Sequence, residues 1–218
     1  MRHHHRLALF ALLIVVFAAT GCRSMYYSTM EMFGREKRHI LRSDIENVSK
    51  EQNAAAQEFK DALTRLKEMY GFAGGDLEDM YRKLQSDYED CDGRARSVRA
   101  RIKDMEQVAG DLFTEWEKEI TEISNTDLRS KSSESLRLTR QRYDRLDDAV
   151  NHSADRMDPV LQQLKDYVLN LKHNINAQAI GSLKVEADKI EVQVDKLIRD
   201  IQTSVGEADQ FLKAFENP

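Results

Sequence analysis

Residues 41–69 read LRSDIENVSKEQNAAAQEFKDALTRLKEM, and this stretch decides the fold. Its stripe of mostly apolar positions advances by alternating steps of four and three residues: Leu41, Ile45, Val48, Gln52, Ala55, Phe59, Ala62, Leu66 and Met69. Such spacing puts all these side chains on one face of an α-helix, and its persistence over several heptads is typical of helices that pack lengthwise. The stretch therefore predicts a long amphipathic helix with helical partners.

Three later segments carry the same spacing. The first has Leu77, Met80, Leu84, Cys91, Ala95, Val98, Ile102, Met105, Ala109, Leu112 and Trp116, with Tyr88 keeping the interval. The second has Leu136, Tyr143, Leu146, Val150, Met157, Leu161, Leu164, Val168, Leu171 and Ile175, and the third has Ile190, Val194, Leu197, Ile201, Ala208, Phe211 and Phe215. The alternation typical of strands is absent. We expect an all-α fold, an elongated antiparallel helical bundle or coiled coil.

The composition agrees with long helices and few turns. Hydrophobic residues make up 41% of the chain and charged residues 33%, with 9 Gly and 2 Pro among 218 residues. Strands and tight turns need more Gly and Pro than this chain contains. Disorder is not expected, because the apolar residues at helical spacing can form a core.

Breaks in the pattern predict where the helices end. Residues 71–76 form a turn, with Asp76 as a cap for the next helix, and residues 124–133 form a polar loop with Ser132 or Ser133 as a cap. Pro159 leaves the apolar spacing intact, so we expect a mild kink there. Gly181 and Ser182 are interpreted as a tight turn.

These breaks predict four helices, at about 26–70, 76–123, 133–178 and 183–215, within a single domain of residues 22–218. The alternative is three helices, the last one continuous from 133 to 215. Such a helix would extend past the first two by roughly 50 Å at 1.5 Å per residue and expose its apolar stripe. A hairpin of the first two helices would also bring Arg94, Arg96 and Arg101 near Glu51, Glu46 and Asp44.

The N-terminus has the features of a secretion signal. Arg2 and Arg6 precede an unbroken apolar run at residues 7–19, which is too short to span a bilayer as a helix. Residues 18–22 then read AATGC, which resembles the lipobox cut by lipoprotein signal peptidase, with Gly21 before and Cys22 after the cleaved bond. We expect residues 1–21 to be a lipoprotein signal peptide.

Lipid on the Cys22 thiol and amine would place three acyl chains, palmitate among them, in the bilayer. Two chains already give stable anchoring, so three would hold the protein at the membrane. The next residue is Arg23 and not the Asp that resembles an inner-membrane retention signal, which favours the outer membrane facing the periplasm. Loss of Arg2 and Arg6 changes the formal charge from −5 to −7, so nucleic acid is not an expected partner.

Two stretches carry a family resemblance. Residues 25–34 read MYYSTMEMFG and continue to KRHIL at 37–41, while residues 171–180 read LKHNINAQAI. Together they are similar to a family of bacterial coiled-coil lipoproteins described only as a domain of unknown function. The resemblance covers essentially the whole mature chain. It implies a secreted, lipidated, helical protein of the cell envelope and brings no activity, substrate or catalytic residue.

Candidate chemical groups are few. Glu36 and His39 have the Glu-x-x-His spacing of di-metal bundles, but His152 and His173 lack a carboxylate three residues earlier, so we expect no metal and no cofactor. Cys91 lies on an apolar stripe between two Asp residues, which favours a buried structural thiol over an intermolecular disulfide.

Two basic runs invite a phosphate-binding interpretation, but nearby acids favour paired or solvated faces. The runs are Arg94, Arg96, Arg99, Arg101 and Lys103, and Arg137, Arg140, Arg142 and Arg145. The segment around Lys172, His173, Asn174 and Asn176 is a weak helix former. It is interpreted as a register-setting polar layer, a bend, or a candidate partner-binding site.

These features favour a non-enzymatic, lipid-anchored protein acting as a periplasmic scaffold, spacer or adaptor. Its expected partners are the membrane, through Cys22, and an envelope protein or a second copy of the chain. The alternative is a periplasmic carrier or chaperone that binds lipid or unfolded clients, because residues 25–33 are rich in Met, Tyr and Phe.

Overall fold

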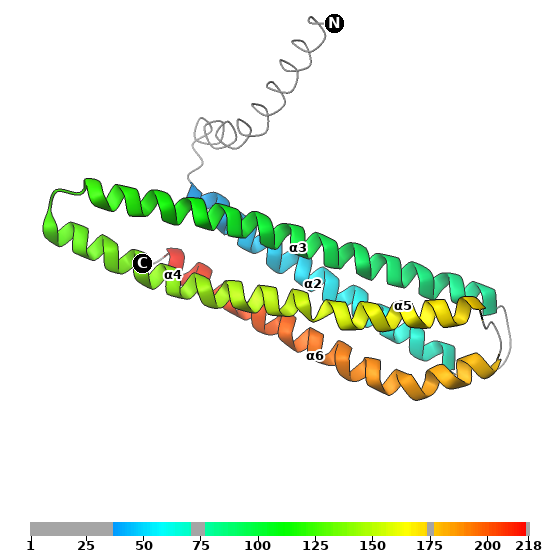
Figure 1. Cartoon of the computed structure of the whole chain (residues 1–218). Coiled ribbons are helices and arrows are strands. Elements are labelled where there is room, and N and C mark those ends of the chain that lie inside the picture. The colour runs from blue at the N-terminus through cyan, green and yellow to red at the C-terminus, as the bar shows by residue number, and fades with distance from the viewer. Residues whose placement is uncertain (1–36, 71–76, 174–176, 217–218) are drawn as a thin grey trace, which may run out of the picture. The chain divides into compact units, whose positions relative to one another are not determined.

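The computed structural model describes residues 37–70, 77–173 and 177–216, and these residues are helical apart from two short connections (Figure 1). The helices are α2 (Lys37–Tyr70), α3 (Leu77–Glu122), α4 (Thr126–Asp155), α5 (Met157–His173) and α6 (Ala177–Glu216). Because α4 and α5 join into one helix of 48 residues, the fold is an antiparallel bundle of four helices without strands in the described ranges. The all-α prediction and the preference for four helices over three are confirmed.

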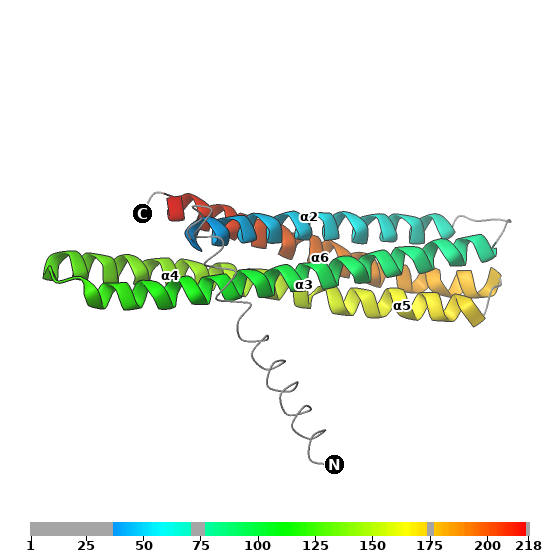
Figure 2. The same cartoon turned by 90° about the horizontal axis from the view of Figure 1, so that it is seen from above.

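The chain divides into two units, Met1–Leu41 and Arg42–Pro218. In the first unit, the described residues 37–41 begin helix α2. The rest of this account concerns the second unit. In it, α3 lies beside the joined α4 and α5, which lie beside α6 (Figures 1 and 2). Helix α2 is tied to α3 by Arg94 and Glu51, and to α6 by Lys67 and Glu191.

The bundle core consists of the predicted apolar stripes. Ile45, Phe59 and Leu66 on α2 are completely buried. The same is true of Leu146 on α4, of Met157 on α5, and of Leu197 and Ile201 on α6. Each fully buried side chain of this size stabilises the fold by roughly 1.5–3 kcal/mol relative to an exposed one. The stripe on α3 differs from the prediction at three described positions, since Met80, Tyr88 and Trp116 are half-buried. Asp87 occupies the buried place next to Tyr88.

The connection between α3 and α4 is shorter than predicted. Residues 124–133 were expected to be a loop, but α4 already begins at Thr126. The Asn125 side chain caps it by accepting hydrogen bonds from the backbone N–H groups of Asp127 and Leu128, both at 3.0 Å. Farther along, the Trp116 indole donates to Ser132 Oγ at 3.0 Å, which fixes the serine-rich turn against α3. Capping and this cross-helix bond outweigh the low helix propensity of serine.

The predicted kink near Pro159 is present, at Arg156. Proline has no N–H to donate to the carbonyl four residues earlier, that of Asp155, and its ring crowds that carbonyl. Helix α4 therefore ends at Asp155, and α5 continues from Met157 in nearly the same direction (Figure 1). The Arg156 N–H bonds to His152 O at 3.2 Å, which closes the last turn of α4.

The turn expected at Gly181 and Ser182 is wrong, because both residues lie inside α6. Helix α5 ends at His173 and α6 begins at Ala177. Residues 174–176 between them lie outside the described part of the chain, and so does the predicted helix start at residues 26–36. A glycine inside a helix costs about 1 kcal/mol relative to alanine, which a long packed helix tolerates.

No helix within the described ranges is both long enough and apolar enough to cross a bilayer.

Candidate functional site

A polar layer interrupts the apolar core where α2, α4 and α6 meet. Gln52, Ser153 and Ser204 are each 0% exposed. Ser204 Oγ donates to Gln52 Oε1 at 2.8 Å, and Gln52 Nε2 donates to Ser153 Oγ at 2.7 Å. Ser153 Oγ in turn donates to the carbonyl of Val150 at 2.8 Å. The three side chains thus form one directed chain of hydrogen bonds, and we call them the polar layer.

Next to this layer, Arg99 of α3 bridges the break between α4 and α5. Its Nη2 donates to the carbonyl of Ala154 at 3.2 Å and to Asp158 Oδ1 at 2.5 Å. A cation aimed at the carbonyl end of α4 interacts favourably with the partial negative charge there. On the α6 side, Asp200 Oδ2 lies 3.4 Å from Arg156 Nε and 3.6 Å from His152 Nε2. All four helices are therefore linked by polar contacts at this level.

An ion pair connects α2 and α3 near the C-terminal end of α2. Arg65 Nη2 lies 2.6 Å from Asp87 Oδ1, and Arg65 Nε donates to Asp87 Oδ2 at 2.7 Å. Burial, together with the nearby charges of Asp90 and Glu58, raises the pKa of the Asp87 carboxyl above its usual range, although the Arg65 charge and hydrogen bond lower it. Asp87 is therefore a buried acid that depends on one partner from a neighbouring helix.

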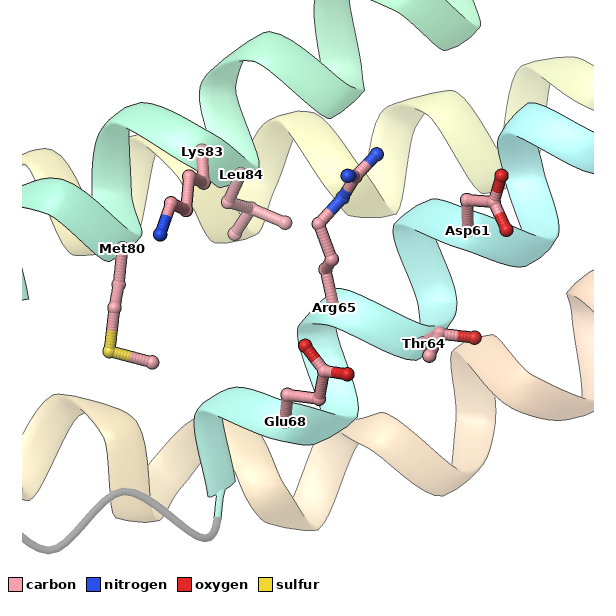
Figure 3. A pocket seen from close by; sticks show the side chains of 7 residues that line it. All are labelled: Asp61, Thr64, Arg65, Glu68, Met80, Lys83 and Leu84. Atoms are coloured by element: carbon pink, nitrogen blue, oxygen red, sulfur yellow. The ribbon is translucent and has the colours of Figure 1, made fainter.

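Beside this pair, a cavity of about 620 Å³ lies between α2 and α3 (Figure 3). Its lining residues are Asp61, Thr64, Arg65 and Glu68 from α2, and Met80, Lys83 and Leu84 from α3. Several of the polar groups have partners within the protein: Lys83 lies 2.8 Å from Asp79, and the Thr64 hydroxyl donates to the Lys60 carbonyl at 2.9 Å. The hydrogen bond and charge of Lys83 lower the pKa of Asp79. Met80 and Leu84 give the cavity an apolar wall.

A second hollow, of about 530 Å³, lies between the end of α3 and the start of α4. It is lined by Glu117, Ile120, Ser133, Leu136, Arg137, Arg140, Gln141 and Asp144. Arg140 crosses between the helices, with Nη1 2.5 Å from Glu117 Oε1 and its guanidinium 5.3 Å from the Phe113 ring centre. The cation therefore contributes to holding the two helices together.

The basic runs are largely paired, as the sequence predicted. Arg94 contacts Glu51 at 3.5 Å and Glu58 at 3.6 Å, which confirms one expected contact of the first hairpin. Arg137 and Arg140 of the second run pair with Glu134 and Glu117.

The expected contact of Arg96 with an acid on α2 is wrong. Arg96 pairs with Asp92 on its own helix, and Glu46 pairs with Arg42, because partners one helical turn away are within reach without crossing the interface. Arg101 lies near enough to Asp44 to lower the pKa of its carboxyl, although burial and the Asp104 charge raise that pKa more strongly.

Cys91 is a free thiol that is 0% exposed on α3. Burial, followed by the nearby carboxylates of Glu58, Asp87 and Asp90, raises its pKa. The prediction of a buried structural thiol is confirmed. This burial disfavours an intermolecular disulfide at Cys91, because a partner sulfur would need the helix to open before it could reach the thiol.

The other predicted site residues are not gathered into one place. Lys172 and His173 are exposed at the end of α5, while Asn174, Asn176, Gly21 and Cys22 lie outside the described residues. His39 is exposed, its proposed partner Glu36 is not described, and His152 faces Asp200. No group of three or more potential metal-binding side chains occurs in the described ranges.

The polar layer was only partly visible in the sequence. Gln52 stands out as a polar residue in its stripe, but Ser153 and Ser204 were passed over. A signal for both was present, because each serine occupies the stripe position between two apolar neighbours: Val150 and Met157, and Ile201 and Ala208. Arg99 and Asp87 gave no comparable signal, since their partners come from distant parts of the sequence.

The comparisons with known proteins give a family and no function. The chain belongs to the family described as "Protein of unknown function (DUF2959)", whose family model matches residues 26–215. No curated protein and no solved structure matches the chain.

Proposed function

We propose that this member of the family of unknown function is a lipid-anchored, non-enzymatic protein of the bacterial cell envelope, acting as a periplasmic scaffold, spacer or adaptor. The observation that carries the proposal is the lengthwise packing of long helices around a filled core. Helix α3 alone has 46 residues, or about 70 Å at 1.5 Å per residue. Helices of this length, held in one alignment by buried contacts, can keep two binding partners at a set distance.

The anchor rests on the sequence of the N-terminus. An apolar run at residues 7–19 followed by Gly21 and Cys22 supports processing by lipoprotein signal peptidase and lipid on Cys22. Arg23 at the next position supports transfer to the outer membrane in a two-membrane host.

The anchor is tested by fractionating cells that make the full chain and the Cys22→Ser variant. The natural chain is expected in the membrane fraction after high-salt and alkaline washes, with a mature N-terminal peptide whose mass includes diacylglycerol. The variant is expected to lose that mass and to remain as uncleaved precursor. A natural chain with an unmodified Cys22 thiol would refute the anchor.

The scaffold or adaptor role is tested separately by cross-linking in cells. The lipidated chain is expected to give reproducible links to one or a few envelope proteins, or to a second copy of itself. A matched variant with the exposed residues Lys172 and His173 changed to Ala tests the candidate partner site at the end of α5. Links that are as numerous and as varied as those of an unrelated lipid-anchored protein would contradict the proposal.

The carrier or chaperone alternative draws on the cavity between α2 and α3. Its volume of about 620 Å³ and its apolar wall of Met80 and Leu84 are suited to part of a lipid or an apolar side chain. Native mass spectrometry of the purified chain is the discriminating measurement. Co-purified lipid that disappears in a Met80→Trp variant, which places a larger ring at the half-buried wall of the cavity, would favour the carrier. A bare chain that forms cross-links in cells would favour the scaffold.

A further inference from the structure

The polar layer sits among apolar layers that are nearly interchangeable. Val48 and Ala55 flank Gln52 on α2, and Ile201 and Ala208 flank Ser204 on α6. If α6 slid past α2 by one helical turn, Ile201 or Ala208 would take the place of Ser204 opposite Gln52, and the layers on either side of it would remain apolar. Apolar packing alone therefore discriminates weakly between alignments, because its attraction has no direction.

The hydrogen bonds of the layer do have direction, and they match in one alignment. The Gln52 amide accepts from Ser204 on α6 and donates to Ser153 on α4. A slide of one turn would put aliphatic side chains opposite Gln52 and leave a buried amide without partners. Burying an unpaired amide is costly, whereas a buried amide with its hydrogen bonds made is tolerated.

We propose that Gln52, Ser153 and Ser204 are register-determining residues that select one alignment of α2, α4 and α6. A single polar residue in an otherwise apolar helical interface has this effect in coiled coils, at a cost in stability. Helix α3 is aligned at the same level by Arg99, which donates to the Ala154 carbonyl next to Ser153. The inference is independent of the proposed function.

The native ion pair between Lys67 of α2 and Glu191 of α6 reports the alignment directly, since Nζ lies 2.6 Å from Oε1. A zero-length carbodiimide joins such a pair as an amide. Asp188 and Asp195 lie about one helical turn to either side of Glu191, so a slipped helix would bring one of them to Lys67. Peptide mass spectrometry of the cross-linked full chain therefore distinguishes the alignments.

The decisive variant is Gln52→Leu, Ser153→Ala and Ser204→Ala in one chain. We expect its urea midpoint to equal or exceed that of the natural chain. We also expect the Lys67 links to spread from Glu191 to Asp188 or Asp195, with at least a tenfold rise in the slipped products. The control is Ile201→Leu, which changes an adjacent layer without adding or removing a polar group and should leave the links unchanged.

Two results would overturn the proposal. One is a folded triple variant whose Lys67 links remain confined to Glu191, since apolar packing would then select the alignment alone. The other is a triple variant that no longer folds, since the layer would then stabilise the fold and not select among alignments. The single variant Gln52→Leu is measured in parallel. It removes the amide alone, while both serines can turn to backbone carbonyls of their own helices. If Lys67 of this variant also links only to Glu191, the proposal fails.

Discussion

Arg65 of α2 and Asp87 of α3 form a two-point ion pair in which the carboxylate is 5% exposed, and both oxygens of Asp87 are bonded to the one guanidinium. The arginine reaches the core from a half-exposed position, with 48% of its side chain accessible. Without Arg65, Asp87 would keep a buried charge whose main local counter-charge is gone. The pair therefore makes the α2–α3 interface sensitive to a single substitution.

Arg65→Met is expected to lower the free energy of unfolding by about 1–2 kcal/mol at pH 7, less than for a fully buried pair because Arg65 is half exposed. The pKa of Asp87 is already raised by burial and should rise further once the arginine that lowers it is removed. A raised pKa in the folded chain gives stability that is present below the unfolded value, about 3.9, and lost as the pH rises. The loss in free energy of unfolding caused by Arg65→Met, measured by urea unfolding, should therefore be smaller at pH 4.5 than at pH 7. The control is Arg42→Met, which removes an exposed pair with Glu46. An equal loss in free energy of unfolding for Arg65→Met at both pH values would contradict the description of Asp87 as a buried acid that depends on Arg65.

Arg99→Met should loosen the junction of α4 and α5. It removes the hydrogen bonds to the Ala154 carbonyl and to Asp158, with an expected loss of about 1 kcal/mol because both side chains are partly exposed. Hydrogen exchange measured by mass spectrometry should accelerate in peptides that cover residues 154–160. Arg96→Met is the matched control, since Arg96 pairs within its own helix. Exchange that is unchanged at the junction would show that Arg99 does not hold it.

Phe211→Ala should be among the most destabilising single changes near the C-terminal end of α6. The Phe211 side chain is 2% exposed, and its ring packs on Phe215 at 5.1 Å and on Tyr143 at 6.0 Å between centres. Removing a buried phenylalanine costs about 3–5 kcal/mol, which urea unfolding measures directly. Leu128→Ala, at a leucine that is 58% exposed, should change the free energy by less than about 0.5 kcal/mol. Similar losses for the two variants would be inconsistent with this packing.

Cys91 should resist alkylation in the folded chain. Only the thiolate reacts, and burial together with the neighbouring carboxylates raises the pKa of this thiol. We expect the peptide containing Cys91 to remain unmodified by iodoacetamide at pH 8 and to be modified completely in 8 M urea, as read by mass spectrometry. Rapid modification without denaturant would mean that α3 opens locally at this position.

The sequence predicted the long helices and their buried faces well, because these follow from local spacing. Leu41 to Leu66 repeats a four-three interval that only a helix can place on one face, and the same holds for Ile190 to Phe215. The buried state of Cys91 followed from its stripe position. The kink before Pro159 followed from the missing N–H of proline.

The helix boundaries were less predictable, because capping contacts compete with intrinsic propensity. Serine-rich residues after Asn125 looked like a loop, but the Asn125 cap and the bond from Trp116 to Ser132 make them helical. Gly181 looked like a turn, yet α6 runs through it. In both cases a contact or a continuous helix outside the local window outweighed the local signal.

By itself the sequence determined that this protein is helical, which face of each helix is buried and where proline interrupts a helix, since each depends on residues within a few turns of one another. Only the tertiary structure decided which polar groups meet. Gln52 finds Ser153 and Ser204 at sequence separations of 101 and 152 residues, and Asp87 finds Arg65 across the helix interface. Hydrogen bonds and ion pairs require defined distances and directions, and such geometry exists only after the helices have packed.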